Sequence, residues 1–325
     1  MSNVTDRRFK YTAFLVLAAA IIFTECCHAY WVWTPGSKKF INPKYAVKDT
    51  PEEQFAWAMG FYNAADYKKA VAEFEKLIKN YEFSEFAAKA QYYLGLSYEK
   101  LEKYYYAYQS YQKIVENYPY SENLDDAILR EFEIANYYLN RKNPKFLGSD
   151  IMAPLGRAIE IFQKVVENAP YGEYADQAQY NLGHAFKKAE RYDEAVQAYR
   201  KFLDEYPSSP LLDEARYQLA LCAYKASLSP AYDQEPVDKA IKAFEEFIDD
   251  ASDPDLVEEA DITLQRLKDR AAQKAFEIAK FYEKQKKYTS AVTYYQDVVD
   301  NYPDSFFAFI SAERMSRLKR KIGER

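Results

Sequence analysis

The sequence predicts an all-α protein, an α-solenoid of about six helical hairpins followed by a C-terminal capping helix. Only eight of the 325 residues are glycine, and alanine, glutamate, lysine, leucine and tyrosine are abundant, which favours helices. A short pattern, an alanine with an aromatic residue four positions later, recurs along most of the chain. In four of its copies a proline stands twelve positions after the alanine. Such periodic self-similarity is typical of a repeat architecture.

The second helix of each hairpin is marked by an alanine with an aromatic residue four positions later. Because residues four apart share one face of a helix, the pair predicts one buried stripe per hairpin. In four hairpins a proline stands twelve positions after the alanine and ends the second helix, because proline cannot continue a helix. The alanines are Ala70, Ala107, Ala158, Ala195, Ala240 and Ala291, and the prolines are Pro119, Pro170, Pro207 and Pro303.

The first helix of several hairpins carries a small residue after a large aliphatic one. A glycine or alanine here, facing the alanine of the second helix, lets the two backbones approach closely. The pairs are Leu94-Gly95, Ile134-Ala135, Leu182-Gly183 and Ile278-Ala279.

These residues resemble the tetratricopeptide consensus. The resemblance implies a right-handed superhelix with a concave groove lined by the first helices, over residues 51–305. Residues 306–325 fit a capping helix with a basic tail, because the exposed end of an array needs a cover; the alternative is a basic amphipathic helix that contacts anionic lipid. The hairpins are expected near 51–84, 88–121, 128–172, 176–209, 213–253 and 272–305, with insertions at 140–156 and 227–237.

An aromatic residue recurs at the fifth consensus position of each first helix. Rings along a concave surface would suit an extended polypeptide rich in apolar and aromatic residues. The alternative is that the rings pack between neighbouring helices. The candidate groove residues are Phe55, Met59, Tyr92, Phe132, Tyr180, Tyr217 and Phe276.

The N-terminus has the build of an export signal over residues 1–29. Basic residues precede an apolar run from Tyr11 to Phe23 that is short for a membrane span. Cleavage after Ala29 and lipidation at Cys26 or Cys27 are both open. The aromatic leader 30–50 is expected to be extended and to dock on the first hairpin; the alternative is that Trp31 and Trp33 lie in the lipid headgroup zone.

Closing phrases of the form Tyr-Pro-x-Ser, at residues 118–121, 206–209 and 302–305, and the segment Leu267–Arg270 resemble the BamD-like lipoproteins of the outer-membrane β-barrel assembly machinery. The resemblance implies a periplasmic location beside the outer membrane, with its inner leaflet as a partner if the chain is lipidated. It also implies a barrel-forming subunit, other assembly lipoproteins and unfolded outer-membrane proteins as partners, with Lys268 and Arg270 at the subunit interface. The alternative is a scaffold of another envelope complex, such as the Tol–Pal partner protein.

Catalytic machinery is not expected. His184 has no second histidine or cysteine at ligand spacing, so we expect neither metal nor cofactor. The formal charge of −6 argues against nucleic acid as a partner. Cys222 is the one cysteine of the body, which excludes an intramolecular disulfide there.

Overall fold

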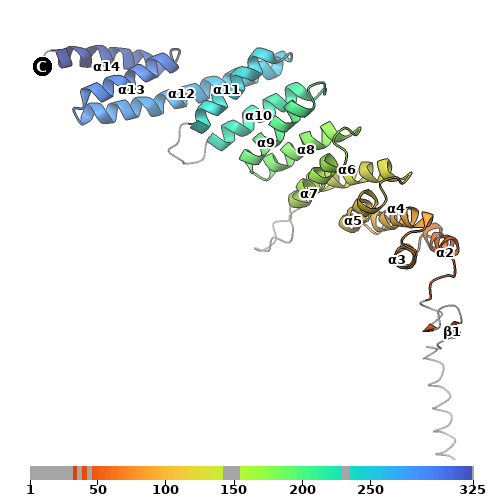
Figure 1. Ribbon diagram of the computed structural model, residues 1–325. Helices are drawn as coiled ribbons and strands as arrows, with labels where there is room; N and C mark the ends of the chain where they lie inside the picture. The colour runs from red at the N-terminus through yellow and green to blue at the C-terminus, as the bar shows by residue number, and fades with distance from the viewer. Residues whose placement is uncertain (1–31, 35–38, 42–45, 142–153, 228–234, 324–325) are drawn as a thin grey trace, which may run out of the picture. The chain divides into compact units, whose positions relative to one another are not determined.

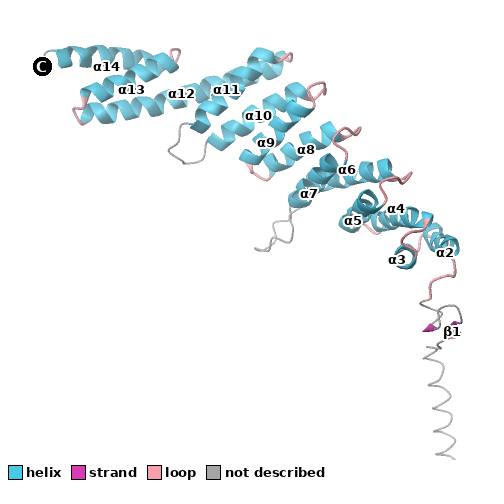
Figure 2. Cartoon of the chain, viewed as in Figure 1, coloured by secondary structure: helices cyan, strands magenta, loops and turns pink. Residues whose placement is uncertain are grey.

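The computed structural model describes residues 32–34, 39–41, 46–141, 154–227 and 235–323. Thirteen helices, connected mostly by short turns, account for nearly all of these residues (Figures 1 and 2). The all-α prediction is confirmed for the helical body. The helices are α2 (Pro51–Asn63), α3 (Tyr67–Asn80), α4 (Glu85–Lys100), α5 (Tyr104–Asn117), α6 (Leu124–Asn140), α7 (Pro154–Asn168), α8 (Ala175–Lys188), α9 (Tyr192–Glu205), α10 (Leu212–Ser227), α11 (Glu235–Asp250), α12 (Pro254–Lys284), α13 (Tyr288–Asn301) and α14 (Phe306–Gly323).

The predicted leader contains two short strands, which the sequence reading did not anticipate. Strand β1 (Val32–Thr34) pairs antiparallel with β2 (Lys39–Ile41), with Trp33 opposite Phe40. The export signal, Cys26, Cys27 and the centres of both insertions lie outside the described residues.

The last residues of the leader contact the first hairpin. The Tyr81 hydroxyl donates to the Lys48 carbonyl, and the Lys48 amide donates to Oε1 of Gln54 at 2.9 Å. The Lys48 ammonium lies 4.2 Å from the centroid of the Trp57 ring. Docking of this short stretch therefore combines backbone hydrogen bonds with a cation–π contact.

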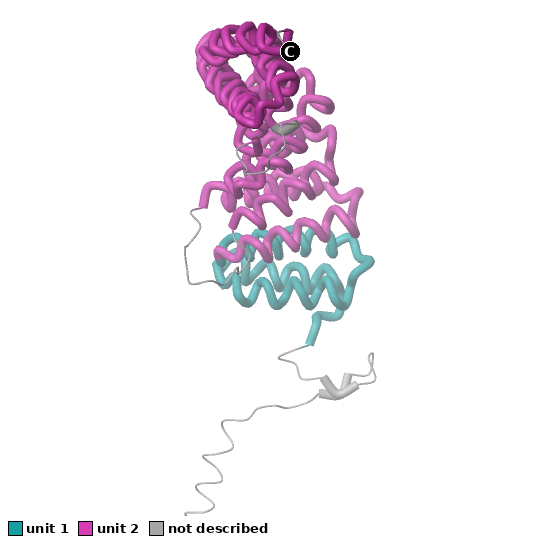
Figure 3. The backbone as a smooth tube through the Cα atoms, turned by 90° about the vertical axis from the view of Figure 1, so that its left-hand side faces the viewer, with its two compact units in different colours: residues 1–101 teal, residues 102–325 magenta. Residues whose placement is uncertain are grey.

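The chain divides into two compact units, which Figure 3 colours separately. Unit 1 ends at Leu101, and unit 2 comprises residues 102–325. The boundary falls inside the hairpin expected at 88–121.

The second helices bury the predicted stripe. In each of them the repeat alanine and the large residues four and seven positions later are essentially inaccessible to solvent. Side chains at i, i+4 and i+7 lie on one helical face, so every hairpin contributes one such face to the core. The buried triplets are Ala70-Phe74-Leu77 in unit 1 and, in unit 2, Ala107-Tyr111-Ile114, Ala158-Phe162-Val165, Ala195-Tyr199-Phe202, Ala240-Phe244-Phe247 and Ala291-Tyr295-Val298.

Four turns between paired helices use a left-handed residue that is not glycine. Their φ angles lie between 57° and 59°, and each stands two residues before the next helix. A side chain in this conformation crowds the backbone, so glycine is preferred here. The four residues are Ala65, Glu102, Glu190 and Lys286.

We expect Glu190→Gly to stabilise the protein by about 0.5 kcal/mol. Relief of left-handed strain gains about 1 kcal/mol, and the greater freedom of glycine in the unfolded chain removes part of this gain. Urea denaturation followed by circular dichroism measures the difference. Arg200→Gly, in the exposed interior of α9, is the control and should lose about 1 kcal/mol. A loss of stability in the Glu190→Gly variant would contradict the expectation.

Helix α12 differs from the prediction because it begins well before residue 272. Its 31 residues start at Pro254, with the Asp253 carboxylate accepting from the Asp255 amide as an N-cap. Buried residues continue through Ala260, Leu264, Leu267 and Ala271. No glycine or proline interrupts the helix after its first residue, so one helix serves both the fifth and the sixth hairpin.

Helix α14 packs against the last hairpin through Ala308, Ser311 and Leu318. The Arg314 guanidinium donates to the Glu283 carboxylate at 3.0 Å and lies 5.6 Å from the Phe276 ring centroid. The Arg314 and Tyr295 hydrogen bonds hold the pKa of Glu283 below its usual range although burial opposes them. The helix thus closes the core formed by α12 and α13.

Candidate functional site

The structure places the predicted groove rings between helices. Phe132, Tyr217 and Phe276 are buried, and Phe55, Tyr92 and Tyr180 are half-buried, as is Met59. An open ladder of rings is therefore not present at these positions. The fifth consensus position lies against the second helix of its own hairpin, so the rings fill the space between helices.

Ring contacts show this packing directly. Phe132 is 6.0 Å from Phe162 of α7 and stacks at 5.4 Å on Tyr174. Phe276 likewise lies between Tyr295 of α13 and Phe307 of α14, at 5.6 and 5.4 Å. Such aromatic pairs add stability to the core, and their faces are occupied by other rings.

The remaining predicted rings make similar contacts. In unit 1, Phe55 lies 5.5 Å from Phe86, whereas Tyr92 is half-buried and contacts the ring of Tyr93 on the same helix, at 5.7 Å. In unit 2, the Tyr217 ring is 5.5 Å from Phe247. Tyr180 packs on Tyr199, and burial together with the Glu214 carboxylate raises the pKa of its hydroxyl. We therefore infer that the main role of these residues is to pack the helices together.

The first helices of unit 2 carry polar groups that join neighbouring helices; Lys187 and Lys188 were expected near the groove, whereas the Asn136–Asn181 pair was not predicted from the sequence. Nδ2 of Asn181 donates to Oδ1 of Asn136 at 2.9 Å, which joins α8 to α6. Lys188 donates to the Leu139 carbonyl at 3.2 Å, and Lys187 donates to Gln218. Asn136 and Asn181 stand directly beside the small-residue pairs Ile134-Ala135 and Leu182-Gly183, and this position could have indicated them in the sequence. Half-buried amides can also hydrogen-bond an extended peptide backbone.

His184 lies on the same face of α8 as Asn181 and Lys188, and its side chain is half-buried. Burial, and then the nearby Lys188 and Lys187 charges, lower the pKa of its imidazole. The ring is therefore neutral at pH 7. Within the described ranges, no three histidine, cysteine or acidic side chains gather as a metal site would require.

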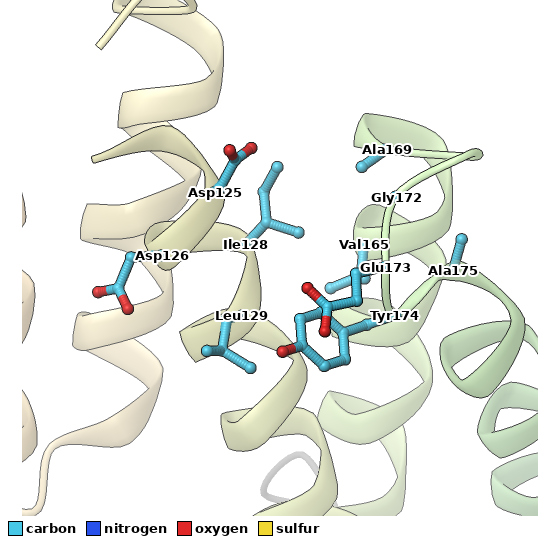
Figure 4. Close-up of a pocket in the computed structure, with 10 residues that line it drawn as sticks. All are labelled: Asp125, Asp126, Ile128, Leu129, Val165, Ala169, Gly172, Glu173, Tyr174 and Ala175. Atoms are coloured by element: carbon cyan, nitrogen blue, oxygen red, sulfur yellow. The ribbon is translucent and has the colours of Figure 1, made fainter. Parts of the chain in front are cut away.

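A pocket of about 390 Å³ lies where α6 begins, α7 ends and α8 begins (Figure 4). Ile128, Leu129 and Val165 give it apolar walls, and Asp125 and Glu173 bring carboxylates to it. This combination suits an aliphatic stem that ends in a cation. The sequence reading missed the pocket because its residues come from three separate helix ends.

Two tyrosines stand in the turns that border this region. Tyr120 precedes α6 and is 101% exposed, and Tyr171 precedes α8 and is 96% exposed. Isolated exposed apolar residues are common on proteins. These two rings occupy equivalent turns of consecutive hairpins, so they form a recurring aromatic edge.

The predicted partner-interface residues lie on α12. Lys268 is half-buried, and its ammonium pairs with the Glu245 carboxylate of α11 at 2.7 Å. Arg270 is exposed and makes no salt bridge to any residue that the structure describes. Lys268 thus joins two helices of this chain, whereas Arg270 is available to a partner.

The helical hairpins define a tetratricopeptide repeat protein, and the profile of such repeats matches residues 55–122. The chain belongs to the family described as outer membrane lipoprotein, YfiO, whose profile matches residues 153–325. That match includes α12, α13 and the segment with Arg270. The BamD-like character indicated by the sequence is confirmed.

Two curated relatives are outer membrane protein assembly factors BamD. The protein of Rickettsia prowazekii is 26% identical over 162 residues, which cover 50% of this chain and 63% of the relative. The protein of Caulobacter vibrioides is 22% identical over 161 residues, which cover 48% and 53%. The chain thus spans less than two thirds of the length of these relatives.

Solved structures of other repeat arrays are also similar. The C-terminal part of a TPR repeat-containing protein from Cytophaga hutchinsonii is 17% identical and covers 81% of this chain and 88% of its own, with a TM-score of 0.33. A structure of MamA is 17% identical, covers 61% and 90%, and has a TM-score of 0.34. These likenesses carry no functional argument.

Among the helices described, none combines the length and the apolar character that crossing a bilayer requires.

Proposed function

We propose that this protein is a scaffold of the machinery that assembles outer-membrane β-barrel proteins. The observation that carries the proposal is the match of residues 153–325 to the outer membrane lipoprotein family, together with two relatives that are named assembly factors. The site of action would be the periplasm, beside the outer membrane. Lipid attachment at Cys26 or Cys27 belongs to the same proposal.

The scaffold would bind and not catalyse. The groups with strongly raised pKa values, such as Glu131 and Tyr199, owe the shift first to burial between packed helices. Groups of this kind serve packing, whereas a catalytic acid or base must reach a substrate in a cleft. No step of the proposed function requires a cofactor.

Two kinds of partner follow from the proposal. The barrel-forming subunit would meet α12 near Arg270, and other assembly lipoproteins would join the same complex. Unfolded outer-membrane proteins would meet the earlier hairpins, where the exposed Tyr120 and Tyr171 rings and the Asn136–Asn181 pair offer aromatic and amide contacts.

Affinity purification from detergent-solubilised envelopes tests the function. We expect co-recovery of the barrel-forming subunit, and we expect Arg270→Glu to reduce it at least tenfold, because a like charge at an interface costs several kcal/mol. Arg200→Glu, on the exposed face of α9, is the control with the same charge change. Recovery of Tol–Pal components alone would favour the alternative scaffold.

A further inference from the structure

One end of the last hairpin is strongly basic although the whole chain carries a formal charge of −6. The cations come from three segments: the last turn of α12, the α12–α13 turn and the last turns of α14. All six are exposed. They are Lys284, Lys286, Lys287, Lys319, Arg320 and Lys321, and we call them the basic end.

The three segments lie together in space. The Lys321 ammonium is 5.9 Å from the ring centroid of Tyr288, the first residue of α13. The charge of Lys321 also helps to lower the pKa of Glu283, near the end of α12. In Figure 1 the α12–α13 turn and the C-terminal end of α14 lie at the same end of these helices.

Neighbouring carboxylates are already engaged elsewhere. Glu283 pairs with Arg314 at 3.0 Å, and Glu313 pairs with Arg317 at 2.8 Å. The six cations make no salt bridge to any residue in the described part of the chain. The basic end therefore has a net positive charge that no described residue neutralises.

Helix ends account for only part of this charge. A cation in the last turn of a helix interacts favourably with the helix dipole, by about 0.3–1 kcal/mol. Lys286 and Lys287 lie in the turn after α12, beyond its last turn. Six cations at one place also repel one another, so dipole stabilisation alone is a weak reason for the cluster.

Apolar side chains stand beside these cations. Phe281 of α12 is 57% exposed, and Ile322 of α14 is 39% exposed. An apolar side chain that is surrounded by lysines can enter the region between headgroups and acyl chains, while the ammonium groups stay with the phosphates.

We propose that the basic end binds the surface of a bilayer that contains anionic lipids. Five of its six cations are lysine, a flexible point charge that follows a fluid layer of headgroups, whereas a fixed carboxylate of a protein is better matched by the planar fork of arginine. Positive charge opposite anionic headgroups supplies the attraction, at about 1 kcal/mol for each cation near the surface. The proposal does not depend on the assembly function.

Co-sedimentation of the full chain with vesicles tests the proposal. One set contains phosphatidylcholine and phosphatidylglycerol, and the other contains phosphatidylcholine alone. The test variant is K284Q/K287Q/R320Q/K321Q. The control, K68Q/K79Q/K113Q/R200Q, removes the same charge from exposed positions elsewhere. Circular dichroism of both variants checks that each is folded.

We expect the wild type and the control to prefer the anionic vesicles, and the test variant to bind them at least about tenfold more weakly. Added salt should abolish the preference, because screening shortens the range of the attraction. Equal binding by test variant and control would overturn the proposal. So would loss of an envelope protein partner from the test variant with vesicle binding unchanged, since the basic end would then bind an acidic protein surface.

Discussion

Replacing Glu131 with glutamine is expected to stabilise the protein by about 4 kcal/mol at pH 8 and to have little effect near pH 4. The difference should be visible in urea denaturation followed at several pH values. Glu133→Gln, on the exposed face of the same helix, is the matched control and should leave the pH profile unchanged.

The reason is the position of Glu131 in the core of unit 2. Its side chain is fully buried in α6, and no described residue makes a hydrogen bond of good geometry to either carboxyl oxygen, since Nδ2 of the nearby Asn168 donates to Oε1 of Gln112 at 2.9 Å. Burial is the largest cause that raises the pKa of Glu131 to about 8; the nearby Asn168 amide acts against it, and the Glu116 charge acts in the same direction as burial. Tyr108 and Glu116 face it from α5, and Asn168 faces it from α7.

Other hairpins show what this position requires. Gln54 and Gln179 stand four residues before the small residue of their first helices, as Glu131 does. Each is buried and donates through Nε2 to a main-chain carbonyl of the second helix, that of Glu73 at 3.0 Å and that of Ala198 at 2.8 Å. By repeat register, we expect the Ile161 carbonyl to be the acceptor for a protonated Glu131. Only the neutral carboxylic acid can donate this hydrogen bond.

The sign of the pH effect follows from the raised pKa. Below pH 4.5 both the folded and the unfolded chain hold the proton, so the contribution of Glu131 is fully present. Between pH 4.5 and about 8 the unfolded chain releases the proton more readily, and stability falls as the pH rises. Glutamine keeps its donor at every pH. A Glu131→Gln variant with the same pH profile as the wild type would show that Glu131 is ionised in the folded protein.

The architecture could be predicted from the sequence because it depends on the spacing of residues that are close together in the chain. The small residue and the ring four positions later repeat at every second helix, and all six alanines are buried. The long α12 was not found, since its first part carries no repeat phrase and only the absence of glycine and proline indicates its continuity.

The candidate surfaces were harder to predict from the sequence, because a pattern of residues does not determine which neighbouring side chain covers a ring. Phe276 has the spacing of a groove residue, yet Phe307 of α14 lies 5.4 Å from it. The basic end also needs the fold, which brings the α12–α13 turn beside the end of α14. For Glu131 a signal did exist, since glutamine stands at the equivalent place in Gln54, Gln91 and Gln179.

Two glycine-to-alanine substitutions are expected to have opposite effects on stability, because the two glycines have different neighbours. A Cβ atom built on Gly183 would lie 2.8 Å from Cε1 and Cζ of Tyr199, whereas one on Gly60 would meet no atom within 4 Å. Glycine inside a helix costs about 1 kcal/mol relative to alanine. Gly60→Ala should therefore stabilise the protein by up to about 1 kcal/mol.

Gly183→Ala should destabilise it by about 1–2 kcal/mol, because overpacking costs about 1–3 kcal/mol and outweighs the gain in helix propensity. Tyr199 is fully buried and packs on Tyr180 at 5.6 Å, so its ring has no free space into which to move. Gly183→Val, with its branched side chain, should cost roughly 3 kcal/mol or more.

A double-mutant cycle separates the clash from other effects of the substitution. In a Tyr199→Ala background every clashing ring atom is absent, so Gly183→Ala should lose its penalty and show a favourable coupling of about 1 kcal/mol or more. Urea denaturation of the four proteins measures the coupling. Additive losses would show that the close approach of α8 and α9 does not depend on the missing side chain at Gly183.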